Sequence, residues 1–98
     1  MVSEEMIKER LKEVIDPEIG YDIISLGEIE EIKIKNNEIY IKFLPTTPLC
    51  PFIPAILEGI KEKLQDLANE YKINIEIDFE NQWSIERVDP GIRKELGI

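Results

Sequence analysis

The sequence contains no histidine and a single cysteine, and both shortages exclude familiar chemistry. One thiol forms neither an internal disulfide nor a CxxC redox motif. A Cys-His nucleophile is excluded because no imidazole is present to act as the base. Any metal must therefore be held by thiolate, carboxylate, backbone oxygen or a second chain. A lone thiol is also typical of a reducing compartment, and we expect a cytoplasmic protein.

Long apolar runs and a basic N-terminal segment are missing as well, so the sequence predicts neither a membrane span nor a secretory signal. Positive charge is scarce, because 12 Lys and Arg stand against 21 Asp and Glu and give a formal net charge of −9. Such an acidic chain disfavours binding to phosphate backbones, and we expect no nucleic-acid partner. The 98 residues, 43% of them hydrophobic, predict a single folded domain over residues 1–98.

Hydrophobic periodicity predicts the elements of the N-terminal half. Ser3 is a plausible N-cap, and apolar residues at helical spacing predict a helix over about 4–15 that ends before Pro17. Residues 16–26 have no sustained period and predict an ordered loop with buried Ile and Leu side chains. The period then drops to two, which predicts a hairpin over 32–43 that turns at Asn36-Asn37. A change of parity ahead of it predicts a bulge near Glu30-Glu31.

The C-terminal half predicts one long helix, one strand and a tail. After a proline-rich connection, apolar residues recur every three or four positions from Ile53 to Tyr71, and alternation over 73–79 predicts a third strand. Strand, helix, strand implies a crossover to a parallel neighbour. A short helix starts after Asp89 and ends at Gly97. The expected fold is a two-layer α+β domain, in the order helix, hairpin, helix, strand, with a three-stranded mixed sheet and a C-terminal tail carrying a short helix.

The only thiol, Cys50, precedes the longest helix. If Pro51 is the first helical residue, Cys50 is the N-cap, where unpaired amide N–H groups favour a thiolate. Pro54 supports the alternative that the helix begins near it and leaves Cys50 in a rigid turn. The hydroxyls of Thr46 and Thr47 could hydrogen-bond a thiolate or an inorganic sulfide. A lone cysteine is also often a small buried hydrophobe, and that alternative stays open.

The second candidate is Asp16-Pro17-Glu18. These carboxylates could complete an iron site beside a thiol, because iron accepts mixed sulfur and oxygen ligands. Taken alone, the segment is equally a helix stop whose carboxylate caps the next turn. Trp83 and Arg87 are most simply residues that pack the tail onto the sheet, and binding of a partner is the alternative. The remaining acidic residues are expected on a solvated surface.

Four segments together resemble the SufT and PaaD-like family of small iron-sulfur cluster assembly domains. The resemblance covers about residues 5 to 98, and the Thr-Thr-Pro-x-Cys-Pro segment placed after a hairpin is its most specific part. The chain departs from the family pattern at Leu49, where Gly is usual, and at Glu28, where an apolar residue is common. The matching segments are Asp16-Pro17-Glu18, Ser25-Leu26-Gly27, Thr46–Pro51 and the tail from Trp83 through Arg87-Val88 to Arg93–Ile98.

The resemblance implies an assembly or carrier factor that helps deliver iron-sulfur clusters to recipient proteins and is not an enzyme. It implies that Cys50 is the reactive or ligating residue and that Asp16 lies close by as a metal ligand or orienting group. Thr46 and Thr47 would bind the cargo as hydrogen-bond donors. The cargo would be iron or an iron-sulfur cluster, held transiently. The expected partners are the iron-sulfur assembly machinery and client apoproteins.

One cysteine per chain cannot enclose a cluster, so a homodimer or ligation shared with a client or a small thiol would be required. Two rival functions remain. The first is an interaction adaptor in an assembly or oxygenase complex, in which Cys50 is buried and unreactive. The second is a thiol enzyme, which the absence of a general base disfavours.

Overall fold

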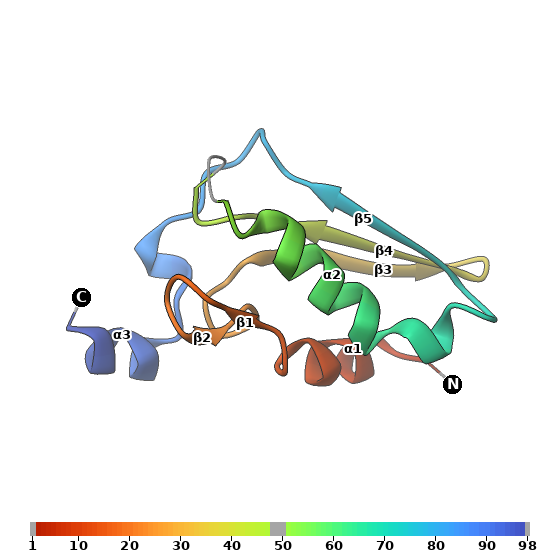
Figure 1. The fold of residues 1–98 in the computed structure, drawn as a ribbon, viewed down its shortest axis with the longest axis horizontal. Helices are drawn as coiled ribbons and strands as arrows, with labels where there is room; N and C mark the ends of the chain where they lie inside the picture. Colours follow the sequence, from red (N-terminus) through yellow and green to blue (C-terminus); the bar gives the residue numbers. More distant parts are fainter. Residues whose placement is uncertain (1, 48–50, 98) are drawn as a thin grey trace.

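The computed structural model describes residues 2–47 and 51–97 and shows a small α+β domain (Figure 1). Within these residues, no helix is long and apolar enough to cross a membrane. The helices are α1 (Glu4–Leu11), α2 (Ile53–Lys63) and α3 (Pro90–Leu96), with short 3-10 turns η1 (Gln65–Leu67) and η2 (Ile85–Arg87). The strands are β1 (Ile15–Asp16), β2 (Tyr21–Asp22), β3 (Ile29–Lys35), β4 (Glu38–Phe43) and β5 (Lys72–Ile77).

The main sheet has three strands in the order β3-β4-β5, and it is mixed, as expected. β3 and β4 form the predicted hairpin, and β5 pairs with β4 in parallel after the α2 crossover, with Ile41 opposite Ile75. The register between β3 and β4 shifts between Ile29 and Glu31, which confirms the predicted bulge. The hairpin turns through Asn36 and Asn37, both with positive φ, as a two-residue turn matched to the twist of the strands requires.

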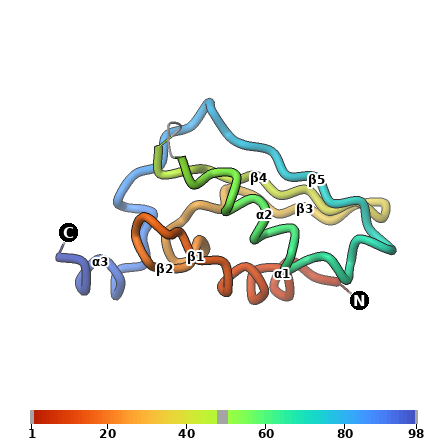
Figure 2. The backbone as a smooth tube through the Cα atoms, viewed as in Figure 1, coloured from red at the N-terminus to blue at the C-terminus, as the bar shows by residue number. Residues whose placement is uncertain are grey.

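One face of this sheet carries the core. Ile39, Ile41 and Phe43 alternate along β4 and are at most 1% exposed, because successive side chains of a strand point to opposite faces. They pack with the buried residues of α1 and α2, which provide the second layer of the fold. The tube in Figure 2 shows both helices running beside the sheet, while α3 lies apart from them near the C-terminus.

The first predicted helix is shorter than expected. Ser3 caps it as predicted, through a 3.2 Å hydrogen bond from the Met6 amide to the Ser3 hydroxyl. The helix nevertheless ends at Leu11, and Ile15 belongs to a strand that pairs with Asp22. This tertiary pairing outweighs the local helical spacing, which is why the two-stranded sheet of β1 and β2 was not predicted.

The ends of the next predicted elements also shift. The regular helix α2 ends at Lys63, and the apolar spacing that continued to Tyr71 runs through the η1 turn instead. The third strand ends at Ile77, so Phe79 lies outside it and is 70% exposed. The tail helix matches its prediction, with the Asp89 carboxylate accepting from the Gly91 amide and Gly97 in the left-handed conformation.

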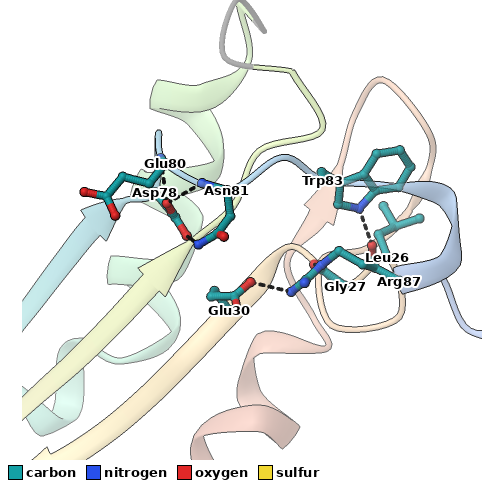
Figure 3. A network of polar contacts seen from close by, with 8 residues as sticks. All are labelled: Leu26, Gly27, Glu30, Asp78, Glu80, Asn81, Trp83 and Arg87. Atoms are coloured by element: carbon teal, nitrogen blue, oxygen red, sulfur yellow. Dashed lines mark hydrogen bonds and ion pairs between the residues drawn. The ribbon is translucent and has the colours of Figure 1, made fainter.

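The tail returns to the segment before β3. The Trp83 indole Nε1 donates to the Leu26 carbonyl at 2.6 Å, and the Arg87 Nε donates to the Gly27 carbonyl at 2.8 Å (Figure 3). The Arg87 guanidinium also pairs with Glu30 at 2.8 Å. Trp83 and Arg87 therefore pack the tail against the bend that leads into the sheet, close to the structural role expected of them.

Candidate functional site

Asp16 lies in β1 and has no solvent exposure. Its Oδ1 atom accepts a 2.9 Å hydrogen bond from the Glu18 amide, and its carbonyl accepts from the Gly20 amide at 2.7 Å. The carboxylate therefore caps the turn after β1, as the local interpretation predicted. It does not stand at the end of a helix, because α1 ends at Leu11.

Glu28 is the second buried carboxylate, with 1% of its surface exposed. It lies between the bend that begins at Leu26 and the start of β3. Its amide donates to the Ile23 carbonyl at 2.9 Å, and its carbonyl accepts from the Leu44 amide at 2.6 Å. These two bonds fix the backbone so that the side chain points inward, which corrects the expectation that the acidic residues outside Asp16-Pro17-Glu18 lie on a solvated surface.

The Glu28 carboxyl lies beside that of Asp16, within reach of a hydrogen bond between them. Burial, the negative charge of Asp16 and hydrogen bonding with Asp16 raise the pKa of Glu28 to about 9. The charge of Glu18 acts in the same direction, while the backbone N–H of Thr46 opposes the shift. Glu28 therefore keeps its proton at neutral pH.

A shared proton also accounts for the hydrogen bonding of this pair. Among the described residues, Asp16 Oδ2 and both carboxyl oxygens of Glu28 form no hydrogen bond of ordinary geometry, and the Thr46 N–H approaches Glu28 without reaching that geometry. Buried oxygens without a donor are costly, and two ionised carboxylates would repel each other. When Glu28 is protonated, its O–H becomes the donor that Asp16 Oδ2 lacks.

Thr46 and Thr47 follow β4 and line a hollow of about 300 Å³. The other side of this hollow is formed by the segment after β5, including Phe79 and Trp83. Thr46 is also the residue whose backbone N–H approaches Glu28. The structure thus brings Asp16 and Thr46, which are 30 positions apart in sequence, close to the same buried carboxyl.

The predicted ligand Cys50 lies outside the described residues. Helix α2 begins at Ile53, with Phe52 as its N-cap and Pro54 in its first turn. This agrees with the alternative in which the helix begins near Pro54, and it contradicts the one in which Pro51 is the first helical residue.

Sequence reasoning missed Glu28 as part of the site. The signal was present, since Glu28 occupies a position after Leu26-Gly27 where an apolar residue is common. The sequence alone does not show that the Glu28 carboxyl is buried near Asp16, because that proximity depends on the fold.

The donor set partly fits an iron-containing cargo. Within residues 2–47 and 51–97, no group of three or more Cys, Asp or Glu side chains could hold a metal ion. Two carboxyls and the backbone and hydroxyl groups of a threonine pair are hard oxygen donors and polar contacts, which complement but do not replace a thiolate. These polar groups belong to Asp16, Glu28, Thr46 and Thr47, and the two threonines lie a few positions before the only cysteine in sequence.

The described residues thus form a small α+β domain in which a buried acidic pair, Asp16 and Glu28, lies close to Thr46. The family model described as "Iron-sulfur cluster assembly protein" matches residues 4–77, and the chain belongs to this family. The family resemblance found in the sequence is confirmed.

Comparison with curated proteins gives the same family. The chain is 29% identical to an Fe-S protein maturation auxiliary factor, YitW, from Bacillus subtilis, over 97% of this chain and 98% of that protein. It is 24% identical to the Fe-S protein maturation auxiliary factor SufT from Staphylococcus aureus, over 87% of this chain and 98% of that protein.

A solved structure supports the fold. A conserved hypothetical protein from Thermotoga maritima superposes with a TM-score of 0.85 at 32% sequence identity, covering 99% of this chain and 96% of that one. The α+β architecture is therefore shared with this solved structure over nearly the whole of both chains.

Proposed function

We propose that this protein is a non-enzymatic iron-sulfur cluster assembly factor that carries iron or a cluster transiently and passes it to client apoproteins. Cys50 is the ligating or reactive residue. Asp16 orients or completes the ligation, and Thr46 and Thr47 donate hydrogen bonds to the cargo. The assembly machinery and the client proteins are its partners.

The observation that supports this function most directly is the convergence of Asp16 and Thr46 on Glu28. Two segments that resemble the family pattern are thereby close in space, and one of them leads directly to Cys50. The names of the relatives, which describe maturation of Fe-S proteins, support the same function. A single thiol per chain suits a carrier, because shared ligation with a client or a second copy is easily reversed.

Anaerobic reconstitution with iron and sulfide tests the proposal. The wild-type protein should gain visible absorption together with bound iron, and it should activate an iron-sulfur apoenzyme added afterwards. The Cys50→Ser variant should keep its fold, because the change in volume is small, and should lose both properties. Normal activation of the apoenzyme by this variant would contradict the role of Cys50.

Asp16 has a separate test. If it completes or orients the ligation, Asp16→Asn should lower the amount of iron that reconstituted protein retains. Glu9→Gln is the control, because Glu9 is an exposed carboxylate on α1 that lies outside the proposed site, and its iron retention should match the wild type. Equal iron retention in the wild type and Asp16→Asn would restrict the site to the cysteine and its threonines.

A second function, the interaction adaptor, gains support from the small donor set. Because the described residues offer no group of three Cys, Asp or Glu side chains, they do not form a metal site by themselves. An adaptor would need no such site and would leave Cys50 unreactive. Alkylation of the native protein with iodoacetamide separates the two functions, since slow or absent modification of Cys50 supports the adaptor.

A further inference from the structure

Phe79 is the most exposed large hydrophobic residue of the described chain, with 70% of its surface accessible. It lies on the segment that leaves β5, beyond the last ladder residue, Ile77. Phe79 also lines the hollow of about 300 Å³ whose other aromatic residue is Trp83. A ring displayed at the mouth of a hollow is a common feature of docking sites, where aromatic residues often supply much of the binding energy.

The groups that line this hollow with the two aromatic residues are neutral or already engaged. The Asp78 carboxylate accepts from the Glu80 amide and from both the amide and the side-chain NH₂ of Asn81 (Figure 3). The NH₂ group of Asn81 faces Asp78, so the other atom of that amide is an acceptor, and Gln82 also lines the hollow with an amide that can accept or donate. The hollow thus combines two aromatic residues with oxygen acceptors.

The surroundings of Phe79 are acidic. Phe79 stands between Asp78 and Glu80 in sequence, and a second hollow that it lines also contains Glu76 and Lys42. Three carboxylates therefore accompany one ammonium group around the ring, on a chain whose net charge is −9. The hydrogen bonds from Asn81 and from the Glu80 backbone hold the pKa of Asp78 below its ordinary value, so its charge persists at neutral pH.

A guanidinium group matches these features. It stacks on aromatic faces, it carries five N–H donors and no acceptor, and it is attracted by an acidic surface. An acidic group would be repelled by the carboxylates around the hollow. A purely apolar group would contact the aromatic rings but leave the oxygen acceptors without a donor.

We propose that the hollow between Thr46, Phe79 and Trp83 is a docking site for an arginine side chain of a client protein. This rests on the proposed function, because the client is the recipient of the cargo. Thr46 and Thr47, which are proposed to contact the cargo, also line this hollow, so a client bound here lies beside those two residues. Binding of the side chain is non-covalent and requires no group beyond those described.

Trp83 makes the test direct, because it is the only tryptophan in the chain. The probe is the capped tripeptide acetyl-Gly-Arg-Gly-amide, titrated into the full-length protein while Trp83 emission is recorded. A saturable change is expected, and it should weaken as sodium chloride is added because the attraction is partly electrostatic. The same peptide with Glu in place of Arg should produce no saturable change.

Two variants separate this site from a general acidic surface. Phe79→Ala should weaken binding of the arginine peptide about tenfold, as loss of one cation–aromatic contact predicts. Tyr40→Ala is the matched control, because Tyr40 is another exposed aromatic residue, 41% accessible, next to a glutamate on β4. Its effect should be negligible, and thermal melting checks that both variants fold.

Four results would overturn the docking site. They are no saturable change in Trp83 emission, equal binding of a glutamine peptide, an unchanged affinity in Phe79→Ala, or a concentration-dependent dimer that Phe79→Ala dissociates in sedimentation. The last result would make the surface an interface between copies of this chain. Cluster transfer is measured separately, so loss of transfer with intact peptide binding rejects only the carrier function, and the reverse outcome rejects only the docking site.

Discussion

At the scale of single residues, Glu28 is unusual because a carboxyl occupies a position surrounded by the interior of the fold. Its environment favours the neutral acid, since burial and the charge of Asp16 raise its pKa to about 9 from an ordinary value of 4.5. The neutral form can donate to Asp16, whereas the ionised form would be repelled by it. Glu28 therefore links the stability of the protein to pH over a range in which few other groups titrate.

Stability should fall as pH rises from 5 to 8. Over this range Glu28 keeps its proton in the folded state and loses it in the unfolded state, so unfolding releases one proton. The free energy of unfolding then decreases by up to about 1.4 kcal/mol per pH unit. The contribution is fully present below pH 4.5 and is lost toward pH 9. With no histidine in the sequence, no imidazole adds its own titration.

Urea unfolding of the wild type and of Glu28→Gln at several pH values measures this effect. The amide of glutamine can still donate to Asp16 but does not titrate, so the variant should show a much flatter profile and greater stability at pH 8. Glu28→Leu is the second comparison, because it removes the polar group altogether. Parallel profiles in the wild type and Glu28→Gln would show that Glu28 ionises normally in the fold.

Gly27 shows how closely the tail approaches the bend before β3. Its φ is +69°, and a Cβ atom there would lie 2.5 Å from the Arg87 carbonyl oxygen. Gly20 has a similar φ of +87° but has nothing within 4 Å of such a Cβ atom. A side chain at either glycine would have an unfavourable φ, but only a side chain at Gly27 would also clash with a neighbour.

Gly27→Ala should destabilise the protein more than Gly20→Ala. Both alanines pay about 1–2 kcal/mol for the left-handed conformation. Gly27→Ala adds a steric cost of about 1–3 kcal/mol, because Arg87 must shift. Denaturant unfolding of the two variants gives the comparison, and equal losses of stability would show that the contact with Arg87 relaxes without cost.

At the scale of elements, the hairpin was predictable because its signals are local. Strict alternation and an Asn36-Asn37 turn define β3 and β4, and the parity change near Ile29 locates the bulge. The end of the first helix was not predictable in the same way. Ile15 fits the helical spacing but pairs with Asp22, and that choice depends on a partner that local periodicity does not reveal.

The same distinction applies to the site. Asp16 and the two threonines were predicted as site residues from residue type and resemblance, and the structure places Asp16 and Thr46 close to Glu28. Glu28 was missed because its burial depends on the bonds to Ile23 and Leu44, which come from other segments. Residue type thus suggests candidates for a site, whereas the fold decides which of them are neighbours.

The hairpin turn provides a prediction for a single element. Asn37 has a φ of +64°, where glycine meets no penalty from a Cβ atom. Asn37→Gly should raise the free energy of unfolding by up to about 1 kcal/mol, and Asn37→Ala should lower it. Thermal or urea unfolding of the two variants measures the difference. Equal stability of the Gly and Ala variants would show that the turn changes its conformation.

At the scale of the whole molecule, the tail and the bend before β3 form a connection across more than 50 residues of sequence. Arg87 contributes to it twice, through the Gly27 carbonyl and through Glu30. The Asp89 amide adds a 2.8 Å bond to the Ser25 carbonyl. The backbone that presents Glu28 is therefore supported by residues beyond the range matched by the family model, which ends at residue 77.

Arg87→Met should loosen this bend without unfolding the sheet. Methionine keeps much of the aliphatic length of the side chain but loses the bonds to Gly27 and Glu30. Loss of a hydrogen bond and an ion pair of this kind predicts amide hydrogen exchange about tenfold faster at Glu28 and Leu44. Exchange measured by NMR should stay unchanged in the ladder between β4 and β5.

Arg10→Met is the matched control for Arg87→Met. Arg10 bonds to the Lys63 carbonyl and to Asp66, joining α1 to the region after α2. Its loss should affect exchange there and leave Glu28 unaltered. If both variants accelerate exchange at Glu28 equally, the bend is coupled to the stability of the whole domain and not to the tail.

The contact between Trp83 and Leu26 also bears on how the protein is made. The chain leaves the ribosome N-terminus first. The bend at Leu26 and the strands β3 and β4 therefore emerge before Trp83 and Arg87, which hydrogen-bond to that bend. Until Trp83 and Arg87 have left the exit tunnel, the backbone that carries Glu28 lacks these supports. A nascent chain can therefore form its hairpin early, whereas the bend that carries Glu28 acquires these supports only after residues 83–87 have emerged.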